Sequence, residues 1–148
     1  MNRRHFILTA LALGAAPPAW TAEPPTILVL GDSLSAEYGI ARGSGWVALL
    51  EKRLAAEKIA AQVVNASVSG DTTAGGRARL PALLKKHAPA VLIIELGGND
   101  ALRGLPLATT VANLSAMAQA AQQAGAKVLL AGMEVPPNYG ADYSRRFQ

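Results

Sequence analysis

Four short apolar runs along the chain predict the strands of a sheet. The runs are rich in Val, Ile and Leu, which is typical of strands covered on both faces. They are residues 26–30, 62–65, 90–96 and 127–131. Strands of this kind belong to the interior of an α/β sheet, so helices are expected on both of its faces.

Three amphipathic stretches separate these runs and repeat apolar residues at the spacing of a helix. The stretches are 46–58, 77–87 and 107–124. Ser44 is a candidate N-cap of the first helix, and Gly125 is the expected C-cap of the last. Pro81 interrupts the second stretch and marks either the true start of that helix or a kink in it.

The elements alternate as strand and helix three times and close with a strand. This order predicts a three-layer α/β fold with a doubly wound parallel sheet. Sheets of this kind bind ligands at the carboxyl ends of their strands. Polar loops that contain glycine follow the first three strands, at 31–35, 67–76 and 97–100. The sequence therefore predicts one site, built from three loops at one edge of the sheet.

Residues 1–22 have the pattern of an export signal. Arg3 and Arg4 precede an apolar stretch over 6–16 that is too short to span a bilayer. The Arg-Arg-x-Phe-Ile arrangement resembles a twin-arginine signal, and the alternative is an ordinary Sec signal that happens to hold two arginines. We therefore expect a periplasmic or secreted protein with a mature domain over 23–148 and no stable membrane anchor.

Composition narrows the choice of partners. The 148 residues are 51% hydrophobic and 16% charged, which suits one soluble α/β domain. The net charge of +4 falls to +2 without Arg3 and Arg4, and the basic residues do not cluster, so no nucleic-acid partner is expected. Cysteine is absent from the sequence, which excludes disulfides, thiolate catalysis and cysteine-bound metals. The oligomeric state is left open.

Ser33 is the residue best placed for chemistry. It closely follows a buried strand, and Gly31 lets the backbone turn so that the serine projects from the sheet edge. Such a serine is a nucleophile if a base removes its proton and donors stabilise the oxyanion. The alternative is that Ser33 or Asp32 only caps the loop, as in most Gly-Asp-Ser triplets.

Gly70 and Asn99, in the loops after the next two strands, offer the donors that an oxyanion needs. A glycine N–H allows close approach, and the Asn99 side-chain amide supplies a further donor. Taken singly, both are ordinary turn residues. Their joint position after successive strands favours a functional role.

Three sequence blocks carry a resemblance to a known family. They are 31–35 (GDSLS), 65–72 (NASVSGDT) and 95–100 (ELGGND). In this order they resemble the first three blocks of the SGNH, or GDSL, hydrolases. More narrowly they are similar to the bacterial periplasmic arylesterases, acyl-CoA thioesterases and lysophospholipases. The resemblance covers nearly all of the chain from Thr26 onward and implies a flavodoxin-like three-layer fold.

The resemblance also implies a role for each candidate residue. Ser33 would accept the acyl group, and its N–H, the Gly70 N–H and the Asn99 side chain would form the oxyanion hole. Asp32 and Asp100 would organise the loops as capping carboxylates. The implied reaction is hydrolysis of a small acyl ester, thioester or lysophospholipid through an acyl-serine, with no metal and no organic cofactor.

The sequence departs from the family pattern at its C-terminal end. SGNH hydrolases carry an Asp-x-x-His block after a fifth strand, and this sequence reaches Gln148 without one. We therefore expect a truncated domain with four strands, in which the fifth strand, the last helix and the triad histidine and aspartate are missing. The two histidines of the sequence are poor substitutes for the missing base. His5 lies in the expected signal, and His87 ends a predicted helix at the edge of the sheet opposite the one that carries Ser33.

Two other functions fit part of the pattern. A nucleotide-binding protein would also use a glycine-rich loop, but 70–77 lacks the Lys-Ser/Thr of a Walker A motif, and no G-x-G-x-x-G follows the first strand. A non-catalytic module that binds an acyl chain or an ester would keep the groove and the oxyanion hole and would need no base.

The absence of the block that holds the base generates a first prediction. Loss of the triad base in a serine hydrolase lowers kcat on the order of a millionfold, so this chain alone should be nearly inactive. Hydrolysis of p-nitrophenyl butyrate by the purified chain measures this. A rate close to that of a full-length relative would contradict the prediction.

Overall fold

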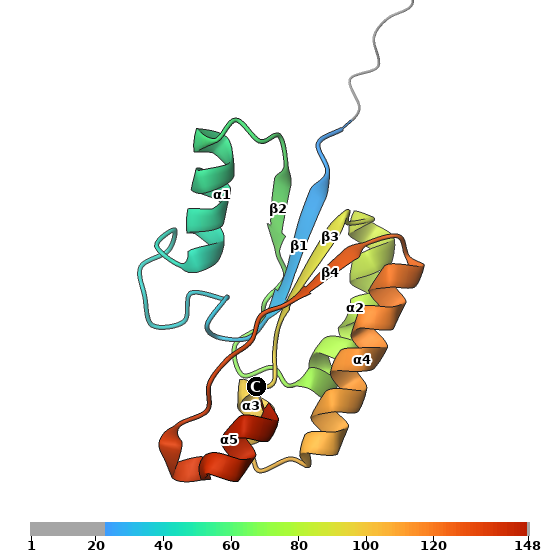
Figure 1. Cartoon of the computed structure of the whole chain (residues 1–148). Helices are drawn as coiled ribbons and strands as arrows, with labels where there is room; N and C mark the ends of the chain where they lie inside the picture. Colours follow the sequence, from blue (N-terminus) through green and yellow to red (C-terminus); the bar gives the residue numbers. More distant parts are fainter. Residues whose placement is uncertain (1–22, 148) are drawn as a thin grey trace, which may run out of the picture.

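A computed structural model describes residues 23–147, so the expected export signal at 1–22 lies outside the described residues. The strands form one parallel sheet in the order β2-β1-β3-β4 (Figure 1). They are β1 (Thr26–Gly31), β2 (Gln62–Asn65), β3 (Val91–Glu95) and β4 (Lys127–Leu130). All four predicted strands are confirmed, each to within one residue at either end.

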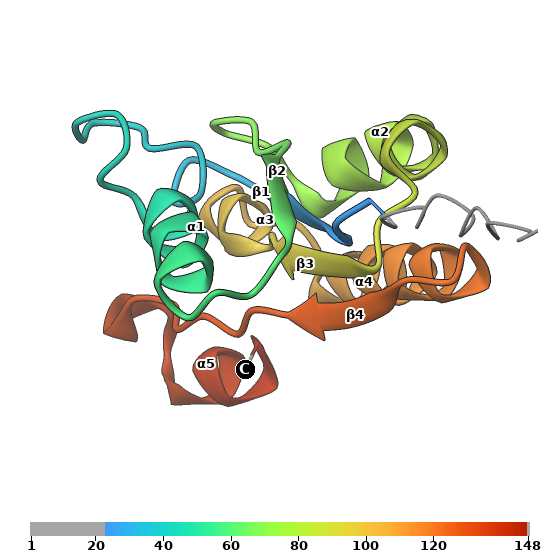
Figure 2. The same cartoon turned by 90° about the horizontal axis from the view of Figure 1, so that it is seen from above.

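Helices cover both faces of this sheet. They are α1 (Trp46–Ala56), α2 (Thr73–His87), α3 (Gly98–Leu102), α4 (Leu107–Gln123) and α5 (Ala141–Phe147), with a 3-10 turn η1 (Pro137–Tyr139) before α5. α1 lies on one side of the sheet, and α2 and α4 lie together on the other (Figure 2). The predicted three-layer α/β architecture with a parallel sheet is therefore confirmed.

Alternation along the central strands sends successive side chains into two cores. Leu28 of β1 and Leu92 of β3 pack with Leu80 of α2 and Met117 of α4. The next residue of each strand points the opposite way and packs against Val47 of α1. Both central strands are thus buried on both faces, which is why their sequences are continuously apolar.

The start of α2 differs from the expectation. The helix begins at Thr73, one turn earlier than predicted, and Pro81 lies inside it. Thr72 is the N-cap, and its side-chain oxygen accepts a hydrogen bond from the Gly75 N–H at 3.3 Å. The first turn contains alanine and two glycines and has no apolar periodicity, so the pattern did not reveal it.

Other local expectations had mixed outcomes. Ser44 is not the N-cap of α1, because Gly45 takes that position and no side chain caps the helix. The expected loop at 97–100 is largely the short helix α3, which is entered through Gly97 at φ +125°. The C-cap of α4 is Ala124 and not Gly125, which follows it in the left-handed conformation (φ +87°) that is common just after a helix end.

β4 forms one edge of the sheet and leaves apolar side chains open. Leu129 and Leu130 are 55% and 51% exposed. No further strand pairs with this edge within the part of the chain that the structure describes. The structure thus has the four strands that the four apolar runs predict.

Leu80 tests the core between α2, α4 and the sheet. Its side chain is 1% exposed, so L80A should lower the free energy of unfolding by about 2–5 kcal/mol through the cavity that it leaves. Urea unfolding measures the change. L83A, at a half-buried position of the same helix, is the control and should cost less. Equal losses in the two variants would contradict this account of the core.

Candidate active site

The loops that follow β1, β2 and β3 meet at the carboxyl edge of the sheet and border an open hollow of about 350 Å³. The hollow is lined by Ser33, Tyr38, Ser69, Gly70 and Asn99. The structure thus brings together the serine, the glycine and the asparagine that the sequence singled out. Each comes from the segment that follows a different strand, as expected if the three strands run parallel.

Tight turns orient the two backbone donors of the hollow. Gly70 has φ +78°, a conformation that glycine adopts without strain, in a turn that the Asp71 N–H closes on the Val68 carbonyl at 3.1 Å. The Gly70 carbonyl accepts a hydrogen bond from Arg103 Nη2 at 2.8 Å. Within residues 23–147, neither the Ser33 N–H nor the Gly70 N–H donates a hydrogen bond, so both are available to a bound group.

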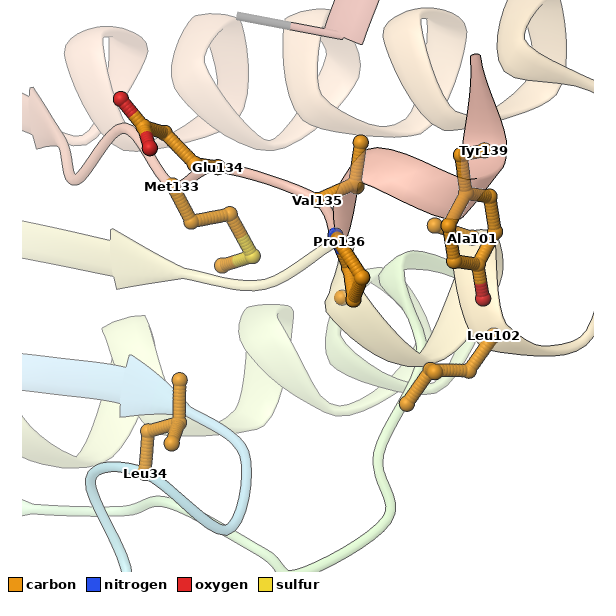
Figure 3. Close-up of a pocket in the computed structure, with 9 residues that line it drawn as sticks. Leu34, Ala101, Leu102, Met133, Glu134, Val135, Pro136 and Tyr139 are labelled. Atoms are coloured by element: carbon orange, nitrogen blue, oxygen red, sulfur yellow. The ribbon is translucent and has the colours of Figure 1, made fainter. Parts of the chain in front are cut away.

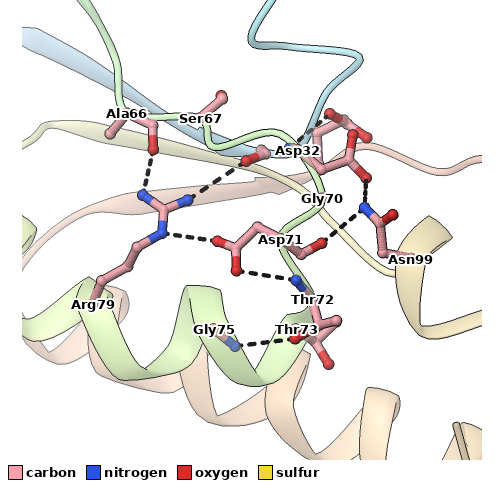
Figure 4. Close-up of polar contacts among 12 residues, drawn as sticks. Asp32, Ala66, Ser67, Gly70, Asp71, Thr72, Thr73, Gly75, Arg79 and Asn99 are labelled. Atoms are coloured by element: carbon pink, nitrogen blue, oxygen red, sulfur yellow. Dashed lines mark hydrogen bonds and ion pairs between the residues drawn. The ribbon is translucent and has the colours of Figure 1, made fainter. Parts of the chain in front are cut away.

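Asn99 lies in the first turn of α3, and its side-chain amide is held from two sides (Figure 4). Nδ2 donates to Asp32 Oδ2 at 3.0 Å and to the Asp71 carbonyl oxygen at 2.9 Å. Both hydrogens of the amide are therefore in use. An oxyanion in the hollow would compete with one of these acceptors for an amide hydrogen.

Asp32 and Asp100 each connect two parts of the site. Asp32 Oδ1 accepts the Leu34 N–H at 3.0 Å, while its other oxygen holds the amide of α3. Asp100 is 1% exposed, and its Oδ2 accepts the Thr73 N–H at 2.9 Å. Its Oδ1 accepts the hydroxyls of Thr73 and Thr110. The Asp100 carboxylate therefore joins α3 to the start of α2 and to α4.

Glu95, at the end of β3, is a buried carboxyl next to the loop that carries Ser33. Its Oε2 accepts the Ser35 hydroxyl at 2.7 Å and the Asp32 N–H at 3.4 Å. Trp46 Nε1 donates to Ser35 Oγ at 3.0 Å, so the serine hydroxyl directs its own hydrogen toward Glu95. Oε1 is buried without a hydrogen-bond partner among the described residues. Burial raises the pKa of the Glu95 carboxyl.

This role of Glu95 was not predicted from the sequence. A signal was present, because Glu95 is the only charged residue in the apolar run 90–96. A carboxyl in such a run must find donors or lose its charge. Local pattern does not reveal that Ser35 and Asp32, from the end of another strand, supply those donors.

A second, mostly apolar pocket of about 190 Å³ adjoins the hollow. Leu34 and Gly98 line it, and they are the sequence neighbours of Ser33 and Asn99, which line the hollow. Its other walls come from α3 and from the segment between β4 and α5 (Figure 3). They include Ala101, Leu102, Met133, Val135, Pro136 and Tyr139.

His87, the one histidine among the described residues, lies at the edge of the sheet opposite this site. It ends α2 and precedes β3, at the amino edge of the parallel sheet, whereas Ser33 follows the carboxyl end of β1. Within residues 23–147, no group of three or more His, Asp or Glu side chains is placed to hold a metal ion.

A parallel α/β sheet that gathers a serine, a glycine and an asparagine at its carboxyl edge is the arrangement of an SGNH-type ester hydrolase. The chain belongs to the GDSL-like lipase/acylhydrolase family, whose profile matches residues 29–148. It is therefore a member of a family of carboxylic ester hydrolases, which confirms the resemblance seen in the three sequence blocks.

Named relatives support this membership. Esterase TesA of Pseudomonas aeruginosa is 58% identical over 126 residues, which cover 85% of this chain and 63% of the relative. Thioesterase 1/protease 1/lysophospholipase L1 of Escherichia coli K12 is 45% identical over 126 residues, which cover 85% of this chain and 59% of the relative. A crystal structure of TesA superposes with a TM-score of 0.81 at 59% identity, covering 82% of this chain and 68% of that one. The chain thus spans about 60% of the length of these curated relatives.

The burial of Glu95 generates a prediction about pH. Its pKa in the folded chain lies above the ordinary value of 4.5, so the folded state binds this proton more strongly than the unfolded state does. The free energy of unfolding should therefore fall as pH rises from 4.5 through the folded pKa. Urea unfolding from about pH 4 to pH 8 measures this dependence.

E95Q is the variant that isolates this effect, because it cannot titrate and should lose the fall. Glu37 has the opposite sign, since hydrogen bonds from the backbone N–H groups of Gly43 and Gly45 lower its pKa. Its contribution is lost as pH falls below the ordinary value, and E95Q retains it. Identical pH profiles for the two proteins would contradict the prediction.

Proposed function

We propose that this site hydrolyses carboxylic esters or thioesters through an acyl group on Ser33. The observation that supports this best is the hollow lined by Ser33, Gly70 and Asn99, with two backbone N–H groups left unbonded within residues 23–147. Fixed donors of this kind stabilise the negative charge that develops on a carbonyl oxygen. The relatives named esterase, arylesterase and thioesterase/lysophospholipase belong to the same chemical class.

In the proposed reaction, Ser33 Oγ attacks the carbonyl carbon while its proton passes to a base. The carbonyl oxygen becomes an oxyanion, which accepts hydrogen bonds from the Ser33 N–H, the Gly70 N–H and the Asn99 amide. The bond to the leaving alcohol or thiol then breaks, and the leaving group takes a proton. Water attacks the acyl-serine in the second half of the cycle and releases the carboxylic acid.

Removal of the Ser33 hydroxyl proton is the step of this cycle for which the described residues offer no base. His87 is at the opposite edge of the sheet, so residues 23–147 place no imidazole beside the serine. For these residues by themselves, hydroxide from solvent would take the proton. The oxyanion hole alone retains about 10³–10⁴-fold catalysis over water in other serine hydrolases, which is enough to detect.

In this proposal the apolar pocket and the hollow bind different parts of the substrate. The pocket behind Leu34 is mostly apolar and suits the acyl part, because burial of methylene groups there is favourable. The hollow beside Tyr38 and Ser69 is wider and more polar, and it suits the leaving group. We infer that the substrates are small acyl esters, thioesters or lysophospholipids, with no nucleic-acid partner and no cofactor.

We also infer that the protein is exported. The support is the twin-arginine-like pattern of residues 1–22, followed by a mature domain at 23–148. In the part of the chain that the structure describes, no helix has the length and apolar character needed to cross a membrane. The proposed location is the periplasm or the exterior of the cell.

Acyl transfer to Ser33 tests the proposal without requiring turnover. At alkaline pH, p-nitrophenyl butyrate should place one butyryl group on the chain, and the group should persist because residues 23–147 place no imidazole beside Ser33 to assist deacylation. Intact mass counts the groups, and peptide mapping should locate the butyryl group on Ser33. N99A should slow the labelling about 10²–10³-fold, the usual effect of losing one oxyanion donor.

Two serine variants serve as controls. S33A should take up no butyryl group at this position. S44A removes an exposed hydroxyl from the same long loop and should be labelled like the unmodified chain. If a fatty acid raises the Tm while Ser33 stays unlabelled, the hydrolase proposal is wrong and the site is that of an acyl-binding module.

A further inference from the structure

Arg79 in α2 contacts three segments that surround the hollow (Figure 4). Its Nε forms an ion pair with Asp71 Oδ2 at 2.9 Å, where the two side chains are 26% and 12% exposed. Nη1 donates to the Ala66 carbonyl oxygen, and Nη2 donates to the Gly31 carbonyl oxygen at 3.5 Å. One guanidinium group therefore joins the end of β1, the end of β2 and the loop that follows β2.

Through its contact with Asp71, Arg79 is linked to two of the donors of the hollow, the Gly70 N–H and the Asn99 amide. Gly70 directly precedes Asp71, so the peptide unit that follows Gly70 is anchored by this ion pair. The Asp71 carbonyl oxygen accepts Asn99 Nδ2 at 2.9 Å, and Asp71 Oδ1 accepts the Thr72 N–H at 3.0 Å. A displacement of Asp71 would therefore move the Gly70 N–H and the Asn99 amide together.

We propose that Arg79 is a positioning residue for the reaction at Ser33, which holds the Gly70 N–H and the Asn99 amide at fixed places relative to the serine. The inference rests on the function proposed above. The planar guanidinium offers five N–H donors, so it can bind one carboxylate and two carbonyl oxygens at once, whereas a lysine ammonium acts as a single point charge.

The expected consequence is an effect on rate rather than on substrate affinity. Donors that are already in place stabilise the developing charge without reorganisation. A small displacement of the donors weakens this stabilisation in the transition state, where the charge is fully developed. The apolar pocket that would hold the acyl group has no wall in α2 and is not disturbed by a change at Arg79.

R79K and R77K form the matched pair of variants. R79K keeps a positive charge near Asp71 but loses the fork that reaches the two strand-end carbonyls. Arg77 lies on the same helix, and its Nη1 donates to Asn113 Oδ1 of α4 at 3.2 Å, away from the hollow. R77K therefore makes the same chemical change on the same helix without touching the segments that Arg79 joins.

Three measurements decide the proposal. The Tm of R79K should match that of R77K, so that any further difference is local. Hydrogen exchange of the Asp71 and Thr72 amides should be about 10-fold faster in R79K or more, because both amides are bonded within the anchored loop. Butyryl transfer to Ser33 should be about 10- to 100-fold slower at saturating ester, with half-saturation unchanged within about twofold.

Equal hydrogen exchange in R79K and R77K would overturn the proposal, and so would an unchanged rate of acyl transfer. If the unmodified chain does not label Ser33 at all, the proposed function fails, and hydrogen exchange alone decides whether Arg79 positions the loop. If R79K does not fold, D71N tests the same link by removing the ionic partner of Arg79. D71N should then show faster exchange at Thr72, and an unchanged value would overturn the proposal.

Discussion

Parallel pairing of β1 with β2 on one side and β3 on the other brings three strand ends to one edge of the sheet. The register decides which residues meet there, and it sets Gly31 opposite Glu95. A Cβ at Gly31 would lie 2.5 Å from Ser35 Oγ and 2.9 Å from Glu95 Oε2. Glycine at this position is therefore required by close packing, and the turn that presents Ser33 depends on it.

Polar groups that this register brings into a crowded edge must find partners, since an unpaired buried carboxylate is costly. Asp32, Glu95 and Asp100 are 3%, 6% and 1% exposed, and each accepts at least two hydrogen bonds. These networks fix the loops and leave the N–H groups of Ser33 and Gly70 as unpaired donors within the described residues. The same contacts that stabilise the edge thus leave donors open toward the hollow, which is the condition for a preorganised oxyanion hole.

Local pattern in the sequence could predict the strands and the candidate site, because both depend on neighbouring residues. Ser33, Gly70 and Asn99 each follow a strand closely, so knowledge of the strand order was enough to group them. The supporting contacts could not be predicted in this way. Glu95 meets Asp32 across 63 residues, and Arg79 meets the end of β1 across 48. Such pairs are set by the register of the sheet and by the packing of α2, neither of which is encoded in a short window.

The peptide unit between Gly31 and Asp32 shows how these long-range contacts act together. Its carbonyl oxygen accepts the Val68 N–H at 3.0 Å and Arg79 Nη2 at 3.5 Å, while its N–H donates to Glu95 Oε2 at 3.4 Å. The Arg79 and Glu95 contacts are long and individually weak. They nevertheless hold the two ends of one planar unit in opposite directions, and rotation of that unit would break all three contacts at once. Such a rotation changes the torsion angles of Gly31 and Asp32 that lead into the next peptide unit, which carries the Ser33 N–H. A buried carboxyl on one side and a guanidinium on the other therefore oppose the same motion. Removal of Glu95 leaves the unit held only at its carbonyl oxygen, whereas removal of Arg79 leaves the Val68 N–H as the one remaining partner of that oxygen.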